Sequence, residues 1–301
     1  MDLRGCQIPT DISSILSRQI SEQKVTWYQP FIFTDEVVAG TAAVWNAGAD
    51  KYLCTEDDPA EVQESFRRET LILGDWYRHL TDILVASFPA ARTFFDFGCN
   101  VGHFGLDLSA RGKVYTGIDV PRNQPGKDLL VAITGIDFEF IPAQYSEEVH
   151  RIPDFDEERS FDVGIFSVVI MHLTDPHYAM RYFSQKIRHG LFFSSLLAPG
   201  DQHHFKARIT PYNRSRSLPH TFELVPTEPL AESLLRFSGF PHLYRIPFRP
   251  GVDPGHSRQW GCWIAAREPV EPTAIERYGL TYVEDRTDRY ADGAPRVVHS
   301  T

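Results

Sequence analysis

The segment of residues 94–104, FFDFGCNVGHF, restricts the possible folds of this chain more than any other. Its apolar start predicts a short strand over Thr93–Phe97. The glycines Gly98 and Gly102 predict a tight turn at the beginning of a helix over Val101–Ala110. The N-terminus of such a helix presents free N–H groups at the end of the strand, where open α/β sheets bind their ligands. The segment therefore predicts an α/β domain with a ligand site at this turn.

After this turn, apolar segments of strand length alternate with helical segments. The further expected strands are Val114–Ile118, Phe138–Ile141, Phe161–Val169, Leu191–Leu197, Leu243–Pro247 and Gly261–Ala266. The expected helices are Asp128–Thr134, Pro176–Ile187 and Pro229–Ser238. This order predicts a mostly parallel sheet. The last two strands have no clear helix between them, which predicts an antiparallel hairpin at one edge.

The chain divides into three zones. Residues 1–92 form a leader that we expect to be an N-terminal helical and aromatic cap, with a short helix over Ile12–Ile20 and a longer one between Pro59 and Pro89. Residues 93–267 form the α/β domain. Residues 268–301 alternate charges with few apolar anchors, and we expect the tail after Asp285 to be mobile.

The spacing Asp96-x-Gly98-x-x-x-Gly102 resembles the first motif of class I S-adenosylmethionine-dependent methyltransferases, whereas the nicotinamide fingerprint GxGxxG is absent. The resemblance extends over residues 93–267 and implies a Rossmann-like, seven-stranded sheet with S-adenosyl-L-methionine as the cofactor. In that family the turn packs under the methionine half of the cofactor, and the acidic residue helps to hold its amino group. The resemblance implies cofactor contacts by Asp96, Gly98, Cys99, Asn100 and Gly102.

Three residues further along the chain fit the same cofactor. Asp119 ends the second strand roughly 20 residues after the glycine turn, where a carboxylate can accept both hydroxyls of a ribose. Alternatively, it is a turn residue at the end of a strand. Residues 161–176 resemble the fourth-strand segment of the family, which places Ser167 near the cofactor. Gln144 follows the third strand and either contacts the adenine or lies on the surface.

Methyl transfer to a hydroxyl, an amine or an acidic carbon requires the removal of a proton, and a histidine with a pKa of about 6.5 is suited to that task. His172 follows the fourth strand and is either the base or a structural histidine of the turn. His203 and His204 follow the fifth strand. They either supply a base, bind a substrate carboxylate or belong to a polar surface loop. Their spacing is not that of a metal site, so no metal is expected.

Two groups of residues are candidates for binding the acceptor. The leader aromatics Trp27, Tyr28 and Trp45 form either a lid over a planar or apolar acceptor or a packing cluster. The motif of residues 27–30, WYQP, is the part of the leader that we would mutate first. A polar insertion after the fifth strand contributes further candidates, which either bind a carboxylate or phosphate of the acceptor or are solvated. These are Arg208, Tyr212 and Arg214.

Two shorter segments resemble the tRNA wobble-uridine carboxymethyltransferase group. They are residues 76–80, WYRHL, and residues 222–240, in which the spacing of the residue types is similar. However, 30 basic and 40 acidic residues give a net charge of −10, which disfavours the basic surface that a tRNA partner requires. We therefore expect a methyltransferase acting on a small-molecule acceptor in specialised metabolite biosynthesis. The alternatives are an RNA methyl or carboxymethyl transferase and a non-catalytic cofactor-binding protein.

The cysteines and the apolar runs bear on the compartment. Cys6, Cys54, Cys99 and Cys262 lie far apart, which predicts neither a disulfide framework nor a zinc site. No apolar run reaches the roughly 18 residues of a membrane span, and the N-terminus lacks the apolar core of a signal peptide. We expect a cytoplasmic protein with no membrane partner, in an oligomeric state that the sequence leaves open.

Overall fold

A central sheet of eight strands organises the described part of the computed structural model, which comprises residues 1–40, 53–153, 155–211, 220–248 and 259–285. The strand order is β13-β11-β12-β8-β7-β4-β5-β6. Five neighbouring strands run parallel: β4 (Thr93–Phe97), β5 (Val114–Asp119), β6 (Glu139–Pro142), β7 (Phe161–Ser167) and β8 (Ile187–Leu197). Three antiparallel additions complete the sheet: β12 (Gln259–Ala266), β11 (His242–Arg245) and β13 (Thr281–Val283). The predicted α/β fold class and the antiparallel end of the sheet are confirmed.

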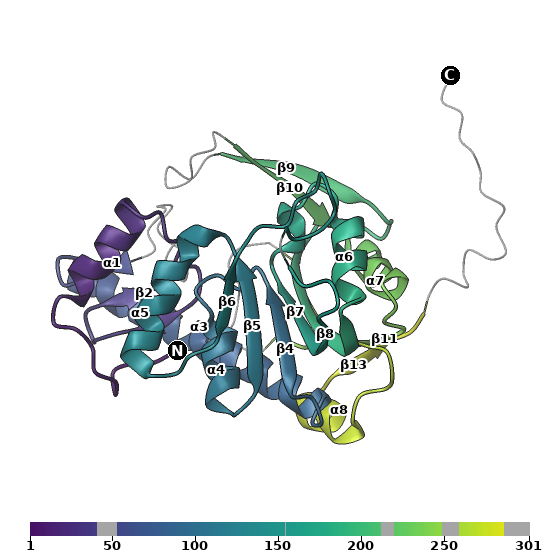
Figure 1. Ribbon diagram of the computed structural model, residues 1–301, viewed down its shortest axis with the longest axis horizontal. Helices are drawn as coiled ribbons and strands as arrows, with labels where there is room; N and C mark the ends of the chain where they lie inside the picture. Colours follow the sequence, from purple (N-terminus) through teal and green to yellow (C-terminus); the bar gives the residue numbers. More distant parts are fainter. Residues whose placement is uncertain (41–52, 154, 212–219, 249–258, 286–301) are drawn as a thin grey trace.

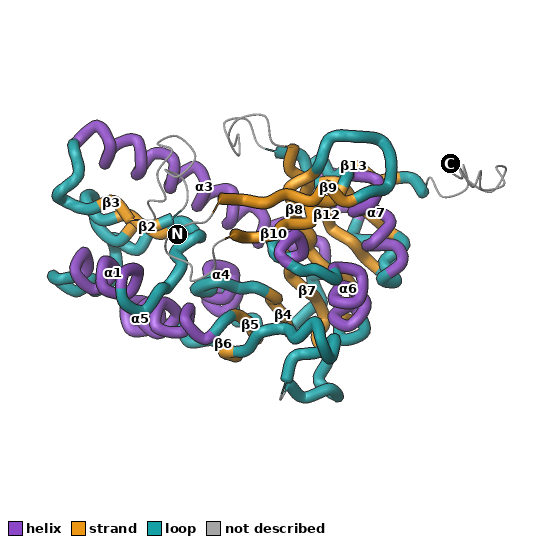
Figure 2. The backbone as a smooth tube through the Cα atoms, turned by 90° about the horizontal axis from the view of Figure 1, so that it is seen from above, coloured by secondary structure: helices purple, strands orange, loops and turns teal. Residues whose placement is uncertain are grey.

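Helices cover both faces of the sheet, because successive side chains of each buried strand point to opposite faces. In β4, for example, Phe94 packs into one core cluster while Phe95 and Phe97 pack into the other. The first cluster includes residues of α3 (Ala60–Ser87), α4 (His103–Ala110) and α5 (Gln124–Thr134), and the second includes residues of α6 (Pro176–Ser184) and α7 (Glu228–Phe237). The two sets of helices lie on opposite sides of the sheet (Figure 2).

The leader packs onto the α3 and α4 side of this domain (Figure 1). Helix α1 (Ile12–Ser21) is followed by a small antiparallel sheet of β1 (Phe31–Ile32), β2 (Val38–Ala39) and β3 (Leu53–Cys54). The long helix α3 then buries Trp76, Leu80 and Leu84, which follow helical spacing, against the same cluster as the leader.

Two parts of the structure differ from the sequence prediction. The polar insertion is an antiparallel hairpin of β9 (Phe205–Pro211) and β10 (His220–Pro226), separate from the main sheet. The charged C-terminal zone contributes α8 (Pro272–Tyr278) and the edge strand β13, which raises the number of strands in the sheet from the predicted seven to eight. A few well-spaced apolar side chains are enough to dock that zone: Val270, Ala274 and Leu280 are buried. No helix in the described ranges combines the length and the apolar character needed to cross a membrane.

Candidate active site

The turn after β4 takes a left-handed backbone conformation at three positions. The φ angles are 78° at Gly98, 54° at Asn100 and 95° at Gly102. Asparagine is one of the few side chains that tolerate this region, so the turn can carry a polar group at Asn100. The backbone N–H groups of Gly98 and Cys99 both donate to the carbonyl of Ile118, at 2.9 and 3.1 Å. The turn is therefore bonded to the end of the neighbouring strand β5.

Both glycines are required by close neighbours. A Cβ on Gly98 would lie 2.7 Å from Cγ2 of Val169, in the segment that follows β7. A Cβ on Gly102 would lie 2.1 Å from Cζ of Phe138. Gly102 therefore permits close packing against the Phe138 ring. The thiol of Cys99 is also buried, next to Gly117, so this residue faces any ligand only through its backbone.

Asp96, the acidic residue of the motif, is fully buried in β4. Its Oδ2 accepts a hydrogen bond of 2.6 Å from the hydroxyl of Tyr115, while its Oδ1 has no hydrogen-bond partner within the described residues. Burial raises the pKa of Asp96 to about 7. A buried carboxylate oxygen without a donor is costly, and an amino group of a ligand at the glycine turn would supply that donor. The residue therefore fits the predicted role.

Asp119 lies at the end of β5 and is bonded to the glycine turn. Its Oδ2 accepts the backbone N–H of Asn100 at 2.7 Å, and its Oδ1 accepts the N–H of Val120 at 2.7 Å and the side-chain amide of Asn123 at 2.8 Å. Burial raises the pKa of Asp119 to about 6, and these hydrogen bonds oppose the rise. The group is thus mostly ionised at neutral pH, and its orientation is set by three donors.

The leader forms hydrogen bonds with the glycine turn, and these contacts were not predicted from the sequence. The side chain of Gln29 accepts the backbone N–H of His103, the first residue of α4, at 2.9 Å, and donates to the carbonyl of Cys99 at 3.1 Å. The side chain of Asn100 donates to the carbonyl of Thr26 at 2.6 Å and accepts the backbone N–H of Tyr28 at 3.3 Å. The only sequence signal for these contacts was the unusual WYQP motif.

Trp27 is the leader aromatic whose surroundings decide most clearly between a lid and a packing cluster. Trp27 is completely buried and makes edge-to-face contacts with Phe31 and Phe33, at centroid distances of 5.7 and 5.8 Å. Its role is therefore in the packing cluster, the alternative given above, because its ring presents no surface to an acceptor. Tyr28 is half-buried and meets the site through its backbone. Trp45 lies outside the described residues.

The segment after β7 has a strained backbone. Val168 has a φ of 58°, an uncommon value for a β-branched residue. Its N–H donates to the carbonyl of Ser194 at 2.9 Å, and the hydroxyls of Ser167 and Ser194 lie 3.2 Å apart. A short 3₁₀ helix, η2 (Ile170–His172), follows. Strained segments are frequent at functional sites. This one leads from the end of β7 to His172.

His172 lies opposite a carboxylate that sequence reasoning missed. Its Nδ1 is 3.9 Å from Oε1 of Glu223, a buried residue of β10. Burial lowers the pKa of His172, and the negative charge of Glu223 acts in the opposite direction. The His172 side chain is 39% exposed, and the lowered pKa favours the neutral imidazole, which can accept a proton. No sequence pattern pointed to Glu223, because only the pairing of the hairpin brings it to this turn.

The remaining predicted residues are more peripheral. His203 and His204 are exposed in the turn after β8, which Thr227 holds by donating to the carbonyl of Gln202 at 2.6 Å. Gln144 is exposed just beyond the end of β6. Arg208 is the register partner of Glu223 in the hairpin, and only its backbone is described. Tyr212 and Arg214 lie outside the described residues.

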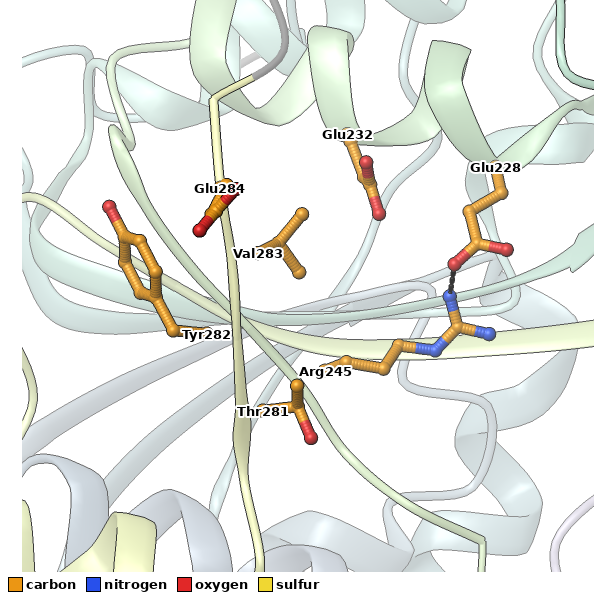
Figure 3. Close-up of a pocket in the computed structure, with 7 residues that line it drawn as sticks. All are labelled: Glu228, Glu232, Arg245, Thr281, Tyr282, Val283 and Glu284. Carbon is orange, nitrogen blue, oxygen red and sulfur yellow. Dashed lines mark hydrogen bonds and ion pairs between the residues drawn. The ribbon is translucent and has the colours of Figure 1, made fainter.

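A cavity of about 440 Å³ lies at the far edge of the sheet, between α7, β11 and β13 (Figure 3). Its lining includes Glu228, Glu232 and Glu284, and Arg245 forms an ion pair with Glu228. Five strands separate β13 from β5 in the sheet order, so this cavity is not part of the glycine-turn site. Within the described ranges, no group of three or more histidine, cysteine or acidic side chains is arranged to hold a metal ion.

One protein family and several solved structures resemble this chain. Residues 67–231, more than half of the chain, match a family described as a methyltransferase domain. A search of curated proteins finds no significant match. Solved structures with a similar fold include the N-terminal domain of EvdMO1 with SAH bound (14% identity, TM-score 0.49, covering 63% of this chain and 80% of that one). Another is magnesium protoporphyrin IX methyltransferase (ChlM) from Synechocystis PCC 6803 with bound SAM (16%, TM-score 0.43, 71% and 86%). A third is the glycopeptide N-methyltransferase MtfA with SAM (11%, TM-score 0.47, 64% and 93%).

Proposed function

Because the chain belongs to the methyltransferase-domain family and uses S-adenosylmethionine as its methyl donor, we propose that it methylates a small-molecule acceptor in specialised metabolite biosynthesis. The observation that carries this proposal is the arrangement of Asp96, the glycine turn and Asp119 at the carboxyl ends of two adjacent parallel strands. This edge of a parallel sheet is where open α/β folds bind nucleotide ligands.

The residues of the turn suit the parts of this cofactor. Oδ1 of Asp96 would accept the amino group of the methionine half. Asp119 would accept the ribose hydroxyls, which requires its ionised form. Ser167, at the end of β7, would lie beside the sulfonium, and Gln144, beyond β6, would meet the adenine. The cofactor supplies an electrophilic methyl group, and the protein contributes position and the handling of one proton.

On the acceptor side, we assign His172 as the base. It follows the strained segment after β7, and its neutral imidazole can take the proton of the attacking group. The histidines His203 and His204, in the exposed turn after β8, would contribute to binding at the rim of the site.

Charge favours a small acceptor over RNA. The net charge is −10, and several arginines that could form a basic face are instead paired with carboxylates. Arg111 contacts Asp82 at 2.6 Å and Asp107 at 3.0 Å, and Arg159 pairs with Glu139. A surface that binds nucleic acid needs unpaired basic groups to neutralise phosphates.

Isothermal titration calorimetry tests the cofactor assignment first. We expect binding of S-adenosylmethionine and S-adenosylhomocysteine and none of NADH, with a loss of about tenfold or more in Asp119→Ala, because hydrogen bonds to a charged group are lost. Asp128→Ala, on the exposed surface of α5, is the matched control and should bind as wild type does. Absence of binding to either sulfur compound would refute the proposal.

Turnover then separates an enzyme from a non-catalytic binder. Wild type is incubated with S-adenosylmethionine and panels of small alcohols, phenols, amines and carboxylic acids, and with bulk tRNA, while release of S-adenosylhomocysteine is followed. Release with a small acceptor supports the proposal. Release with tRNA alone would favour the RNA-modifying alternative, and cofactor binding without any release would favour the non-catalytic one.

A further inference from the structure

We propose that Glu223 is the positioning residue of a His172–Glu223 pair, and that this pair adapts the site to acceptors that are methylated on a hydroxyl oxygen. This inference rests on the methyltransferase function proposed above. It adds a residue from the hairpin to the site and narrows the acceptor to one chemical class.

The hairpin brings Glu223 to the end of β7. Strands β9 and β10 lie above the carboxyl ends of β7 and β8 (Figure 1), and β10 packs against both η2 and β8. Register along the hairpin is continuous from His220 to Pro226, and the bridge between Ala198 and Thr227 fastens its base to the end of β8. The position of Glu223 is thus set by the pairing of β10 with β9 and by the bridge at the base of the hairpin.

Burial distinguishes Glu223 from an ordinary surface carboxylate. Only 8% of the residue is exposed. Taking a carboxylate out of water is costly unless a charge or a donor compensates it. The ionisable ring that faces it in the described structure is His172, with 3.9 Å between Nδ1 and Oε1. That distance is longer than a direct hydrogen bond, as catalytic contacts often are before substrate binds, and it suits an ion pair once the imidazole is protonated.

Two other histidine–carboxylate pairs within the described residues lack this combination. In the pair of His150 and Asp175, 4.0 Å apart, the carboxylate side chain is 33% exposed, compared with 11% for Glu223. His189 lies 3.9 Å from Asp162, but that carboxylate also accepts the backbone N–H groups of Arg92 and Thr93. It lies at the amino end of β7, away from the cofactor turn. Of these described pairs, the one at η2 joins a buried carboxylate of the hairpin to the segment that follows β7.

The geometry assigns different tasks to the two ring nitrogens. Glu223 holds Nδ1 of His172 as the N–H donor, which leaves the lone pair of Nε2 for the acceptor. In the reaction, Nε2 takes the proton of the hydroxyl while the oxygen forms a bond to the methyl carbon. The bond from that carbon to sulfur breaks, and its electron pair stays on sulfur. The products are a methyl ether, a neutral thioether and an imidazolium, whose charge the Glu223 carboxylate stabilises.

This device matters most for a hydroxyl. A neutral amine attacks through its own lone pair and can release its proton afterwards, so it gains little from a base in the transition state. An alcohol or phenol is a poor nucleophile until its proton is transferred, and a positioned base contributes about 10²–10⁴-fold to such steps. A carboxylate behind the imidazole keeps the correct tautomer and stabilises the cation that forms.

The first test needs no acceptor. The pKa of His172 is measured by NMR titration of its ring in the intact protein, in wild type and in Glu223→Gln. Within the described part of the chain, Glu223 is the charged group that acts on this ring, and its negative charge raises the pKa. Its removal should therefore lower the pKa of His172 measurably. Glu158→Gln, an exposed acid remote from β10, is the control and should leave it unchanged. An unchanged pKa in Glu223→Gln would overturn the pairing.

The second test uses the hydroxyl acceptor with the fastest turnover in the alcohol and phenol panel. Glu223→Gln should lower kcat by about 10²-fold while the affinity for S-adenosylhomocysteine stays unchanged, and Glu223→Asp should recover part of the rate. The limb of the pH profile that rises with pH should move to lower pH in Glu223→Gln, in step with the pKa. The double variant with Glu223→Gln and His172→Ala should have the same kcat as His172→Ala alone, because the two residues act as a unit.

The outcomes separate this inference from the function on which it rests. If none of the small acceptors leads wild type to release S-adenosylhomocysteine, the proposed function fails. The NMR titration still decides whether His172 and Glu223 form a pair. If wild type turns over a hydroxyl acceptor and Glu223→Gln has the same kcat and pH profile, the positioning role is wrong. Turnover confined to amines would refute the hydroxyl class.

Discussion

The side-chain oxygen of Gln29 accepts the backbone N–H of His103 at 2.9 Å, so a leader residue caps the helix that begins at the glycine turn. The same side chain donates to the carbonyl of Cys99. One amide thereby satisfies the N–H of His103 at the start of α4 and adds a second hydrogen bond to the carbonyl of Cys99, which also accepts the N–H of Gly102 at 3.0 Å. The leader is consequently a structural part of the cofactor site.

Removing this cap should destabilise the protein and loosen the turn. We expect Gln29→Ala to lower the free energy of unfolding by about 1–2 kcal/mol, the usual effect of a lost helix cap, and to weaken binding of S-adenosylhomocysteine. Urea denaturation and calorimetry measure the two effects. Gln23→Ala, at an exposed position of the same leader, should change neither. Wild-type behaviour of Gln29→Ala would show that the turn keeps its shape without the leader.

A side chain at Gly102 should collide with Phe138. Gly102→Ala adds a Cβ that would lie 2.1 Å from Cζ of the ring, at a φ of 95° that alanine avoids. We expect the free energy of unfolding to fall by about 3 kcal/mol, from overpacking and backbone strain together. The control is Gly112→Ala, which has a φ of 73° but no atom within 4 Å of the added Cβ, so it reports the backbone part alone. Equal losses in the two variants would contradict the steric explanation.

The buried acids predict how stability depends on pH. Burial raises the pKa of Asp96 to about 7, whereas in the unfolded chain an aspartate titrates at about 3.9. Between these values the folded protein binds more protons than the unfolded chain. The contribution of Asp96 to the free energy of unfolding therefore falls as the pH rises through that window.

Asp96→Asn should remove that contribution and flatten the pH dependence of stability of the cofactor-free protein. Urea denaturation at about pH 4.5 and about pH 7.5 measures the difference, with Asp128→Asn on the protein surface as the control. Burial raises the pKa of Asp119 to about 6, so this residue still makes a smaller contribution to the pH dependence of stability in the variant. A slope as steep as that of wild type would mean that Asp96 is ionised throughout.

Substitutions of Trp27 test whether this residue packs the leader or binds the acceptor. Because its ring is fully buried against Phe31 and Phe33, Trp27→Ala should lower the free energy of unfolding by about 3–5 kcal/mol. Trp27→Phe should retain most of the stability and the KM for the acceptor. If Trp27→Phe instead raised that KM while leaving stability intact, the lid interpretation would be restored.

Local patterns predicted the elements that make up the cofactor turn. The apolar strand, the glycines and the following helix are contiguous in sequence, and the demand for a left-handed backbone at Gly98 can be read from residue type alone. Asp119 was found in the same way, because the spacing from the turn to the end of the next strand is short and regular. The edge strand β13 was missed because the segment around it carries few apolar residues, and pairing with β11 supplies the rest of its stability.

Residues 93–119 thus determine the conformation of the glycine turn, since adjacent residues set the conformation of a turn whatever surrounds it. Tertiary structure decided which distant side chains complete that site. Gln29 reaches α4 because the leader packs across the turn, Trp27 is buried by the same packing, and Glu223 meets His172 because a hairpin folds back over η2. Such contacts depend on the relative placement of whole elements, and that placement is decided by the burial of apolar surface across the entire domain.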